Sequence, residues 1–277
     1  MSILDKISKD HLREYLEKCS AFVDIDVDAA INLTNQFIKK HRGENVLYED
    51  VKHMVDLETQ WYASLSVNTP DYSVYADPYY YCEVWLCWKN YSRRYLKEIS
   101  SKKSLFTKSI VDDMDSVKAV VDLGCGFGYT TIGLKEIFPS AKVYGTNLKD
   151  TPQYSIAKTY ETENDILIID DYTKLDTDLI FASEYFEHFE NPIEHLTDVL
   201  QNTNPRYMLI ANTFNGKAIG HFNSYGHNNK KYDGKTISKM FNDTLRQHGY
   251  EKIETNCWNN RPNYWKKIQG NTLERYL

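Results

Sequence analysis

The stretch VVDLGCGFGYTT, residues 120–131, decides the fold because three glycines alternate with other residues directly after an apolar run. The run predicts a buried strand, and Gly124, Gly126 and Gly128 predict a tight turn into a helix. Glycine also lets a ligand approach the backbone closely. The dinucleotide fingerprint G-x-G-x-x-G would need a glycine at Tyr129, and a P-loop would need a terminal G-K-S/T. The turn is therefore predicted to bind a different ligand.

The composition limits the classes of protein to consider. The chain has 277 residues, of which 42% are hydrophobic and 26% charged, with a net charge of -6 and a pI near 5.8. These values support a sizeable core and argue against a strongly basic nucleic-acid binder. The five cysteines form no CxxC pair, which predicts reduced thiols. No apolar run approaches the roughly 20 residues that span a bilayer, and no signal-peptide core begins the chain. We therefore expect a cytoplasmic protein with no membrane partner.

The pattern of apolar residues divides the chain into two regions. Residues 1–115 show mostly helical spacing, which predicts a helical cap or substrate-binding region. Residues 116–277 alternate between strand and helix patterns, which predicts a doubly wound α/β domain with a mostly parallel sheet of seven strands. A C-terminal antiparallel hairpin with a short turn at 259–262 completes the sheet. The predicted strands are 118–123, 142–147, 166–170, 179–183, 207–212, 251–257 and 264–269. Ligands of such sheets bind beyond the carboxyl ends of the strands.

The segment DLGCGFG, residues 122–128, resembles the first motif of the class I S-adenosylmethionine-dependent methyltransferases, in which an acid lies two residues before the first glycine. The resemblance extends over about residues 116–270, because the strand order with its terminal hairpin also agrees. It implies an enzyme with S-adenosylmethionine as cofactor. The residues that it places at the cofactor here are Asp122, Gly124, Cys125, Gly126, Gly128, Tyr129 and Thr130. The alternative is a structural glycine turn in an unrelated α/β protein.

The end of the second strand departs from the family. An acid usually binds the ribose hydroxyls there, but this chain has Asn147, which can bond a diol only without charge. The stretch VYGTNLKDTPQ is similar to the G-x-T-L-S-x-x-Q form of the cyclopropane-fatty-acid synthase group. That resemblance implies cofactor contacts for Leu148 and Gln153.

The third strand ends in IIDDY, where the family places an acid at the adenine amino group. The resemblance implies this role for Asp170 or Asp171, with Tyr172 near the adenine ring. A turn or helix-capping role for either acid remains an alternative.

The fourth strand runs into ASEYFEHFENP, residues 182–192, where the family places the methionine part of the cofactor and the acceptor. Glu184, Glu187 and His188 have i, i+3 and i+4 spacing, so a helix starting there would bring them onto one face. Methyl transfer is an in-line displacement, so the protein chiefly aligns the acceptor and removes its proton. A histidine with a pKa near neutrality suits proton removal, and His188 is the predicted base. Glu184 is also predicted to contact the cofactor.

A second interpretation of the same residues involves a metal. E-x-x-E-H followed by a later histidine resembles the small-RNA 2′-O-methyltransferases and ubiquinone-pathway O-methyltransferases, which depend on a metal. The resemblance implies a divalent ion held by Glu184, Glu187, His188 and His221, with His227 in reserve. Many methyltransferases of small molecules carry the same motif without a metal, and there the glutamates cap the helix and position the cofactor. The metal is therefore possible but not the favoured interpretation.

The N-terminal region contains an aromatic segment of uncertain role. ADPYYY, residues 76–81, resembles the D-P-P-Y motif of amino-methylating DNA enzymes, but the second proline is missing and no apolar strand leads into it. We favour a loop and helix start that covers the acceptor pocket. Tyr79, Tyr80 and Tyr81 could line that pocket, whereas Trp85 and Trp88 are predicted to dock the helical region on the sheet.

Two basic zones raise the question of an anionic acceptor. One comprises Arg93, Arg94, Lys97, Lys102, Lys103 and Lys108, and the other holds ten Lys or Arg residues between 217 and 267. Solvated helix ends explain such zones by default, although a phosphorylated substrate could be steered by them. We expect a small acceptor with a hydroxyl or amine, of the sugar or nucleotide type, with or without a phosphate. The alternatives are a DNA or RNA methyltransferase and a non-catalytic protein that binds S-adenosylmethionine.

Overall fold

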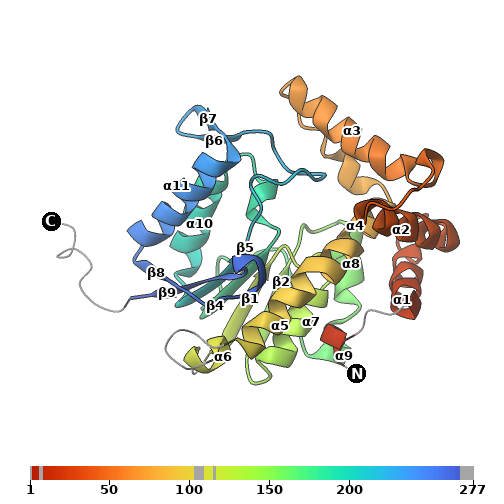
Figure 1. Ribbon diagram of the computed structural model, residues 1–277. Helices are drawn as coiled ribbons and strands as arrows, with labels where there is room; N and C mark the ends of the chain where they lie inside the picture. The colour runs from red at the N-terminus through yellow and green to blue at the C-terminus, as the bar shows by residue number, and fades with distance from the viewer. Residues whose placement is uncertain (1, 6–8, 103–108, 115–116, 269–277) are drawn as a thin grey trace.

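The structure is a computed structural model that describes residues 2–5, 9–102, 109–114 and 117–268. Its central feature is a seven-stranded sheet with the order β3-β2-β1-β4-β5-β9-β8 (Figure 1). The strands are β1 (Ala119–Leu123), β2 (Lys142–Thr146), β3 (Leu167–Ile169), β4 (Leu179–Ser183), β5 (Tyr207–Ala211), β8 (Tyr250–Ile253) and β9 (Asn263–Lys267). Strands β1 to β5 pair in parallel, while β9 is antiparallel to both of its neighbours. The predicted fold class is confirmed.

The order of the strands places the candidate site at one edge of the sheet. Strand β1 lies between β2 and β4, so the chain reverses its direction of progress through the sheet at β1. Residues pair in register across this point, with Leu123 opposite Ala182. The carboxyl ends of β1 and β4 are therefore adjacent, which is where a ligand binds in an open α/β sheet.

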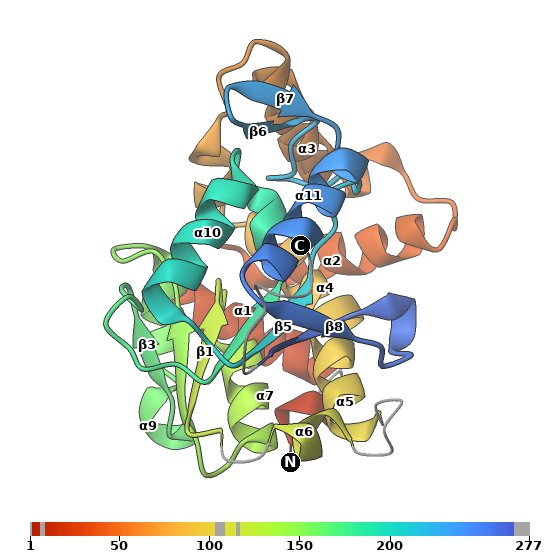
Figure 2. The same ribbon diagram turned by 90° about the vertical axis from the view of Figure 1, so that its left-hand side faces the viewer.

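Helices cover both faces of the sheet, which explains why its central strands are buried along most of their length. Helices α10 (Pro192–Thr203) and α11 (Gly234–Gln247) pack together on one face, towards the viewer in Figure 2. The opposite face carries α5 (Arg93–Ser101) and α7 (Tyr129–Ile137), which also contact each other. The smaller helices are α6 (Ile110–Asp113), α8 (Pro152–Lys158) and α9 (Glu161–Asn164).

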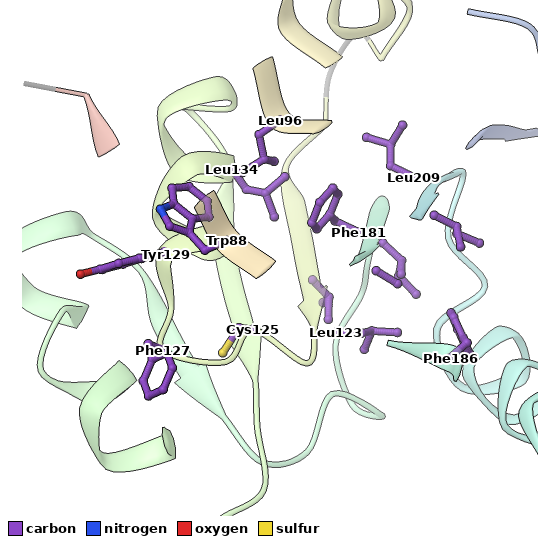
Figure 3. Close-up of a cluster of buried hydrophobic side chains, with 14 of the residues drawn as sticks. Trp88, Leu96, Leu123, Cys125, Phe127, Tyr129, Leu134, Phe181, Phe186 and Leu209 are labelled. Atoms are coloured by element: carbon purple, nitrogen blue, oxygen red, sulfur yellow. The ribbon is translucent and has the colours of Figure 1, made fainter. Parts of the chain in front are cut away.

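The N-terminal region is helical, as the apolar spacing predicted. Its elements are η1 (Ile3–Asp5), α1 (Lys9–Ser20), α2 (Val27–His41), η2 (Tyr48–Asp50), α3 (Lys52–Ser66), η3 (Tyr72–Ala76) and α4 (Tyr80–Cys87). A π-helical turn, Trp88–Ser92, joins α4 to α5, so one long helix passes from the cap onto the sheet (Figure 1). In Figure 3, Trp88 and Leu96 of this helix lie beside side chains of the sheet domain. The predicted boundary at residues 115 and 116 lies outside the described residues.

Two features of the C-terminal half differ from the predictions. A small hairpin, β6 (Tyr225–His227) and β7 (Lys230–Tyr232), was not predicted, and it lies near α3 at the top of Figure 2. The connection between β8 and β9 was predicted as a short turn at 259–262, but it extends from 254 to 262 and contains η6 (Trp258–Asn260). Asn256, Asn259 and Asn260 there have positive φ, which extended strands do not adopt. Among the described residues, no helix has both the length and the apolar character needed to cross a bilayer.

Candidate active site

The glycine turn has the conformation that its sequence requires. Gly124, Gly126 and Gly128 have φ values of 68°, 54° and 88°, which residues with a Cβ adopt only at an energetic cost. A Cβ at Gly124 would also lie 2.4 Å from Cδ2 of Tyr185. Gly128 is the N-cap of α7, so the backbone passes directly from the turn into a helix N-terminus. The turn thus provides the close backbone approach and the partial positive charge that favour binding of a polar ligand.

Asp122 acts inside this turn. Its side chain is 1% exposed and accepts hydrogen bonds from Thr130 Oγ1 at 2.5 Å and Thr131 Oγ1 at 2.7 Å. Burial raises the pKa of Asp122 to about 7, although the two threonine hydroxyls oppose the shift. The carboxylate therefore fastens the first turn of α7 to the end of β1. This placement supports a role in shaping the turn for Asp122 and Thr130, and the predicted cofactor contact of the two residues stays a prediction.

The side chains of Cys125 and Tyr129 also point into the protein. Cys125 is 4% exposed. The ring of Tyr129 stacks against His11 and meets the edge of Trp88, and its hydroxyl accepts a hydrogen bond from Tyr160 at 3.3 Å. Figure 3 shows Tyr129 next to Trp88. The ring of Tyr129 belongs to the core, so a cofactor contact of either residue would be made through the backbone.

Asn147, at the end of β2, closes over the turn. Its Nδ2 donates to Gly126 O at 2.8 Å, and its Oδ1 accepts from the backbone N–H of Leu148. Both polar atoms of the amide are thus used within the protein. Leu148 is 75% exposed, and Gln153 is half-buried in the first turn of α8.

The candidates after β3 lie at the protein surface. Asp171 accepts from the backbone N–H of Thr173 at 2.8 Å and from its hydroxyl, and these bonds lower the pKa of Asp171. Asp170 is exposed and lies 3.9 Å from Lys149 Nζ. Tyr172 is half-buried, and burial raises its pKa to about 12. Asp171 therefore caps a turn in this structure, which is the alternative that the sequence left open. The carboxylate of Asp170 is held less closely, since its nearest ion-pair partner is 3.9 Å away.

Two glutamates meet beyond the end of β4. Glu187 is completely buried, and its Oε1 accepts from the backbone N–H of Thr213 at 2.6 Å. Its Oε2 is buried with no hydrogen-bond partner in the described structure. Glu184 accepts from the Tyr95 hydroxyl and from Thr213 Oγ1, each at 3.3 Å. Burial raises the pKa of both carboxyls, and for Glu187 the charge of Glu184 adds to the effect.

His221 joins this pair from the segment after β5. It is 6% exposed, and its Nδ1 lies 3.0 Å from Gly216 O, so Nδ1 carries the proton and Nε2 keeps its lone pair. One ligand atom each of Glu184, Glu187 and His221 lies within 4.8 Å of the others. A histidine that donates its other N–H to a carbonyl, next to a buried carboxylate oxygen without a partner, fits a divalent cation. The residues present therefore fit the metal that the resemblance implies.

His188 does not belong to that group of atoms. A helix starting at Glu184 was expected, but Glu184 has φ 51°, residues 186–188 form a 3-10 turn, and α10 begins only at Pro192. The i, i+4 geometry is therefore lost, and His188 Nδ1 instead lies 3.1 Å from the Tyr75 hydroxyl, with its ring centroid 4.9 Å from that of His221. Burial lowers the pKa of His188 to about 3, which disfavours the protonated form that a base must reach. His227 is further away, bonded to Glu194 at 2.8 Å.

Several residues at this site were not predicted from the sequence. Arg261, from the β8–β9 connection, donates to Thr213 Oγ1 at 2.6 Å, and its charge opposes the rise in the pKa of Glu184. Thr213, Tyr75 and Tyr95 also contact the acids or His188. None of the four lies in a motif, because each comes from a segment remote in sequence. The Asn-Asn-Arg-Pro run and the aromatic content were the only sequence signals near them.

Three lysines of the basic zones and two tyrosines of the triplet are engaged within the protein. Lys97 pairs with Asp5, Lys102 with Glu98 and Lys231 with Glu190, so these cations are paired with nearby acids. Lys103 and Lys108 lie outside the described residues. Tyr80 and Tyr81 are 9% and 0% exposed and belong to the core, whereas Tyr75 is the tyrosine of this region that reaches His188.

Comparison with known proteins agrees with this geometry. The model of the family described as a methyltransferase domain matches residues 91–254, and the chain belongs to that family. An O-methyltransferase family protein from Burkholderia thailandensis is similar in structure, with a TM-score of 0.51 and 11% identity over 88% of this chain and 72% of that one. The predicted methyltransferase class and its cofactor, S-adenosylmethionine, are confirmed.

Two further solved structures share part of the fold. They are the mitomycin 7-O-methyltransferase MmcR, with a TM-score of 0.41 and 12% identity, and the plantazolicin methyltransferase BpumL with S-adenosylhomocysteine, with 0.40 and 19%. The matches cover 63% and 57% of this chain. This chain spans only 53% and 60% of those two chains. No curated protein matches the sequence.

Proposed function

We propose that the protein transfers the methyl group of S-adenosylmethionine to a small acceptor bound between the N-terminal helices and the ends of β4 and β5. The observation that carries the proposal is the convergence of the half-buried Glu184 with the buried Glu187 and His221 next to the glycine turn. Tyr185 connects the two parts, since it follows Glu184 and its ring lies against Gly124. Cofactor and acceptor sites that are adjacent in this way meet the geometric need of an in-line transfer.

The cofactor part of the proposal rests on the turn between β1 and α7. The backbone of Gly124, Gly126 and Gly128 would lie along the cofactor, and Asp122 keeps the turn in shape. Asn147, Asp170 and the half-buried Tyr172 surround the same end of the sheet. The nucleoside is proposed to bind among them, with the methionine part towards Glu184.

The acceptor part favours a hydroxyl group. A divalent cation held by Glu184, Glu187 and His221 would bind an acceptor hydroxyl and lower its pKa. The chain's own residues would hold the three ligands in place. Thr213 holds both carboxylates, with its N–H on Glu187 and its hydroxyl on Glu184, and Gly216 O fixes the His221 ring. An amine acceptor is the second candidate, because the carboxylates could bind it without a metal.

The surroundings favour a small and weakly charged acceptor of the sugar or nucleoside type. Trp61 and Tyr75 of the cap cover this region, since the Trp61 Nε1 donates to His221 O at 2.7 Å and Tyr75 bonds His188. The carboxylates give the site negative charge, and Arg261 is the basic residue that reaches it among the described residues. A single arginine gives no basic cluster that would bind a phosphorylated acceptor or a nucleic acid at this point.

The test is transfer of labelled methyl from S-adenosylmethionine into a cell extract that is then fractionated into small molecules, protein and nucleic acid. The expected result is label in the small-molecule fraction, lost after chelation and restored by added Mg²⁺ or Mn²⁺. Transfer that ignores the chelator would favour the amine acceptor without a metal. Label in DNA or RNA, or none in any fraction, would overturn the proposal.

A further inference from the structure

The long helix from Tyr80 to Ser101 reaches the site with two hydroxyl groups that belong to none of the predicted motifs. We propose that Ser92 and Tyr95 are positioning residues that fix the carboxylate of Glu184 for methyl transfer. The inference rests on the proposed function, since it takes Glu184 to be part of the acceptor site.

Both hydroxyls are buried and directed at the end of β4. Ser92 is 4% exposed, and its Oγ lies 3.0 Å from Oγ of Ser183, the residue before Glu184. Tyr95 is 0% exposed, and its hydroxyl donates to Glu184 Oε1 at 3.3 Å. Because Ser92 and Tyr95 are three residues apart, they lie on the same face of the helix. One helix face therefore contacts both the side chain of Ser183, directly before Glu184, and the side chain of Glu184 itself.

The helix is irregular at the point of contact. Residues Trp88–Ser92 form a π-helical turn, and Ser92 ends it. Such turns are rare because they disrupt the regular hydrogen bonding of an α-helix. They occur frequently at functional sites. Just beyond, Leu96 packs against α7 so closely that a Cβ at Gly133 would lie 2.7 Å from Leu96 Cδ1. Packing thus holds the helix rigidly on the sheet domain, so the hydroxyls can serve as fixed points.

Glu184 needs such support because its own backbone is strained. Its φ is 51°, in the left-handed region that few residues other than glycine occupy, and its N–H donates to Ala211 O at 2.7 Å. The side chain then extends between two hydroxyls, Tyr95 on Oε1 and Thr213 on Oε2. Removal of the Tyr95 hydroxyl would free one carboxylate oxygen while leaving the other held. The expected effect is a misdirected carboxylate in a protein that still folds.

The experiment compares Tyr95→Phe and Ser92→Ala with the matched control Tyr91→Phe. Tyr91 lies on the same helix, is 43% exposed, and stacks on Trp258 away from Glu184. For each variant we would measure the apparent kcat and the KM for S-adenosylmethionine, using the extract fraction that the wild-type protein labels. The Kd for S-adenosylhomocysteine would be measured by calorimetry. Loss of an interaction that orients a site residue typically lowers activity about 10- to 100-fold.

The expected result is a fall in kcat of about tenfold or more in Tyr95→Phe, a smaller fall in Ser92→Ala, and no change in Tyr91→Phe. The KM and the Kd should stay within about twofold of wild type in all three, and the calorimetric binding stoichiometry should equal that of wild type, whereas a partly unfolded protein would show a reduced stoichiometry. A kcat of Tyr95→Phe and Ser92→Ala equal to that of the control would overturn the assignment while the proposed function stands. Absence of transfer by the wild-type protein would instead overturn the proposed function, and this assignment with it.

Discussion

The glycine turn and the acid pair lie at the carboxyl ends of neighbouring strands, yet they are built in different ways. In the turn, Asp122 bonds Thr130 and Thr131, only 8 and 9 residues further on. At the acid pair, Glu184 bonds Tyr95 across 89 positions and Thr213 across 29. A site held by local bonds is encoded in one motif, whereas a site held by distant segments depends on the whole fold. The cofactor half should therefore tolerate damage to the cap, and the acceptor half should not.

The largest effect is expected from a change in the cap. Trp61 is fully buried, meets the edge of the Phe222 ring and donates to His221 O at 2.7 Å. Trp61→Ala should lower the free energy of unfolding by about 4 kcal/mol through lost packing. Trp61→Phe should cost less, because it keeps much of the packing and loses the hydrogen bond. Denaturant titration gives both values, and equal stability of Trp61→Ala and wild type would show that the cap is not anchored through this residue.

The next largest effect is expected from substitutions in the glycine turn. Gly124→Ala adds a Cβ at φ 68° and 2.4 Å from the Tyr185 ring, whereas Gly126→Ala adds one at φ 54° that is 3.5 Å from Val84. Backbone strain should cost each variant about 1 kcal/mol or more, and overpacking should cost Gly124→Ala a further 1–3 kcal/mol, roughly. Denaturant titration and calorimetry with S-adenosylhomocysteine measure the stability and the affinity. Equal losses in the two variants would mean that the contact with Tyr185 is irrelevant.

The turn was predictable because its residues are consecutive and each does one physical task. Gly128 needs positive φ at a helix start, and that need is visible in the sequence. For the acid pair, the sequence predicted the residues but not the backbone that carries them. Residues 184, 187 and 221 do come together in space, but the helix assumed to join Glu184 to His188 does not exist. Arg261 and Tyr95 could not be found, because nothing local links them to β4.

A smaller effect concerns pH and the turn alone. Burial raises the pKa of Asp122 to about 7, from an ordinary value of 3.8. Because the folded state holds this proton more tightly than the unfolded state, the carboxyl stabilises the fold below about pH 4 and loses that contribution as pH rises to about 7. Asp122→Asn should remove this dependence. The stability of the variant relative to wild type should rise between pH 4 and 7, on the order of 2 kcal/mol.

Denaturant titrations of both proteins at several pH values test this. A constant difference in stability across the range would show that Asp122 ionises normally in the folded protein.

The smallest effect is expected at Asn147, which stands at the end of β2 where the family usually has an acid. Asn147→Asp replaces the Nδ2 donor to Gly126 O with an acceptor, so two oxygens would oppose each other. The loss of one hydrogen bond of about 1 kcal/mol should weaken binding of S-adenosylmethionine about fivefold. Calorimetry measures it, with Leu47→Ala in the cap as an exposed control. A gain in affinity would mean that residue 147 leaves the turn to bind the ribose.

The most direct test of the account is the separation of cofactor binding from transfer in Glu187→Gln. This change keeps the shape and the oxygen that accepts from Thr213 N–H, but it replaces the second oxygen of the fully buried carboxyl group with an amide nitrogen. The account predicts that methyl transfer falls about 100-fold or more while the Kd for S-adenosylhomocysteine stays within about twofold. Transfer at the wild-type rate, or a parallel loss of transfer and cofactor binding, would contradict the claim that Glu187 belongs to an acceptor site distinct from the glycine turn.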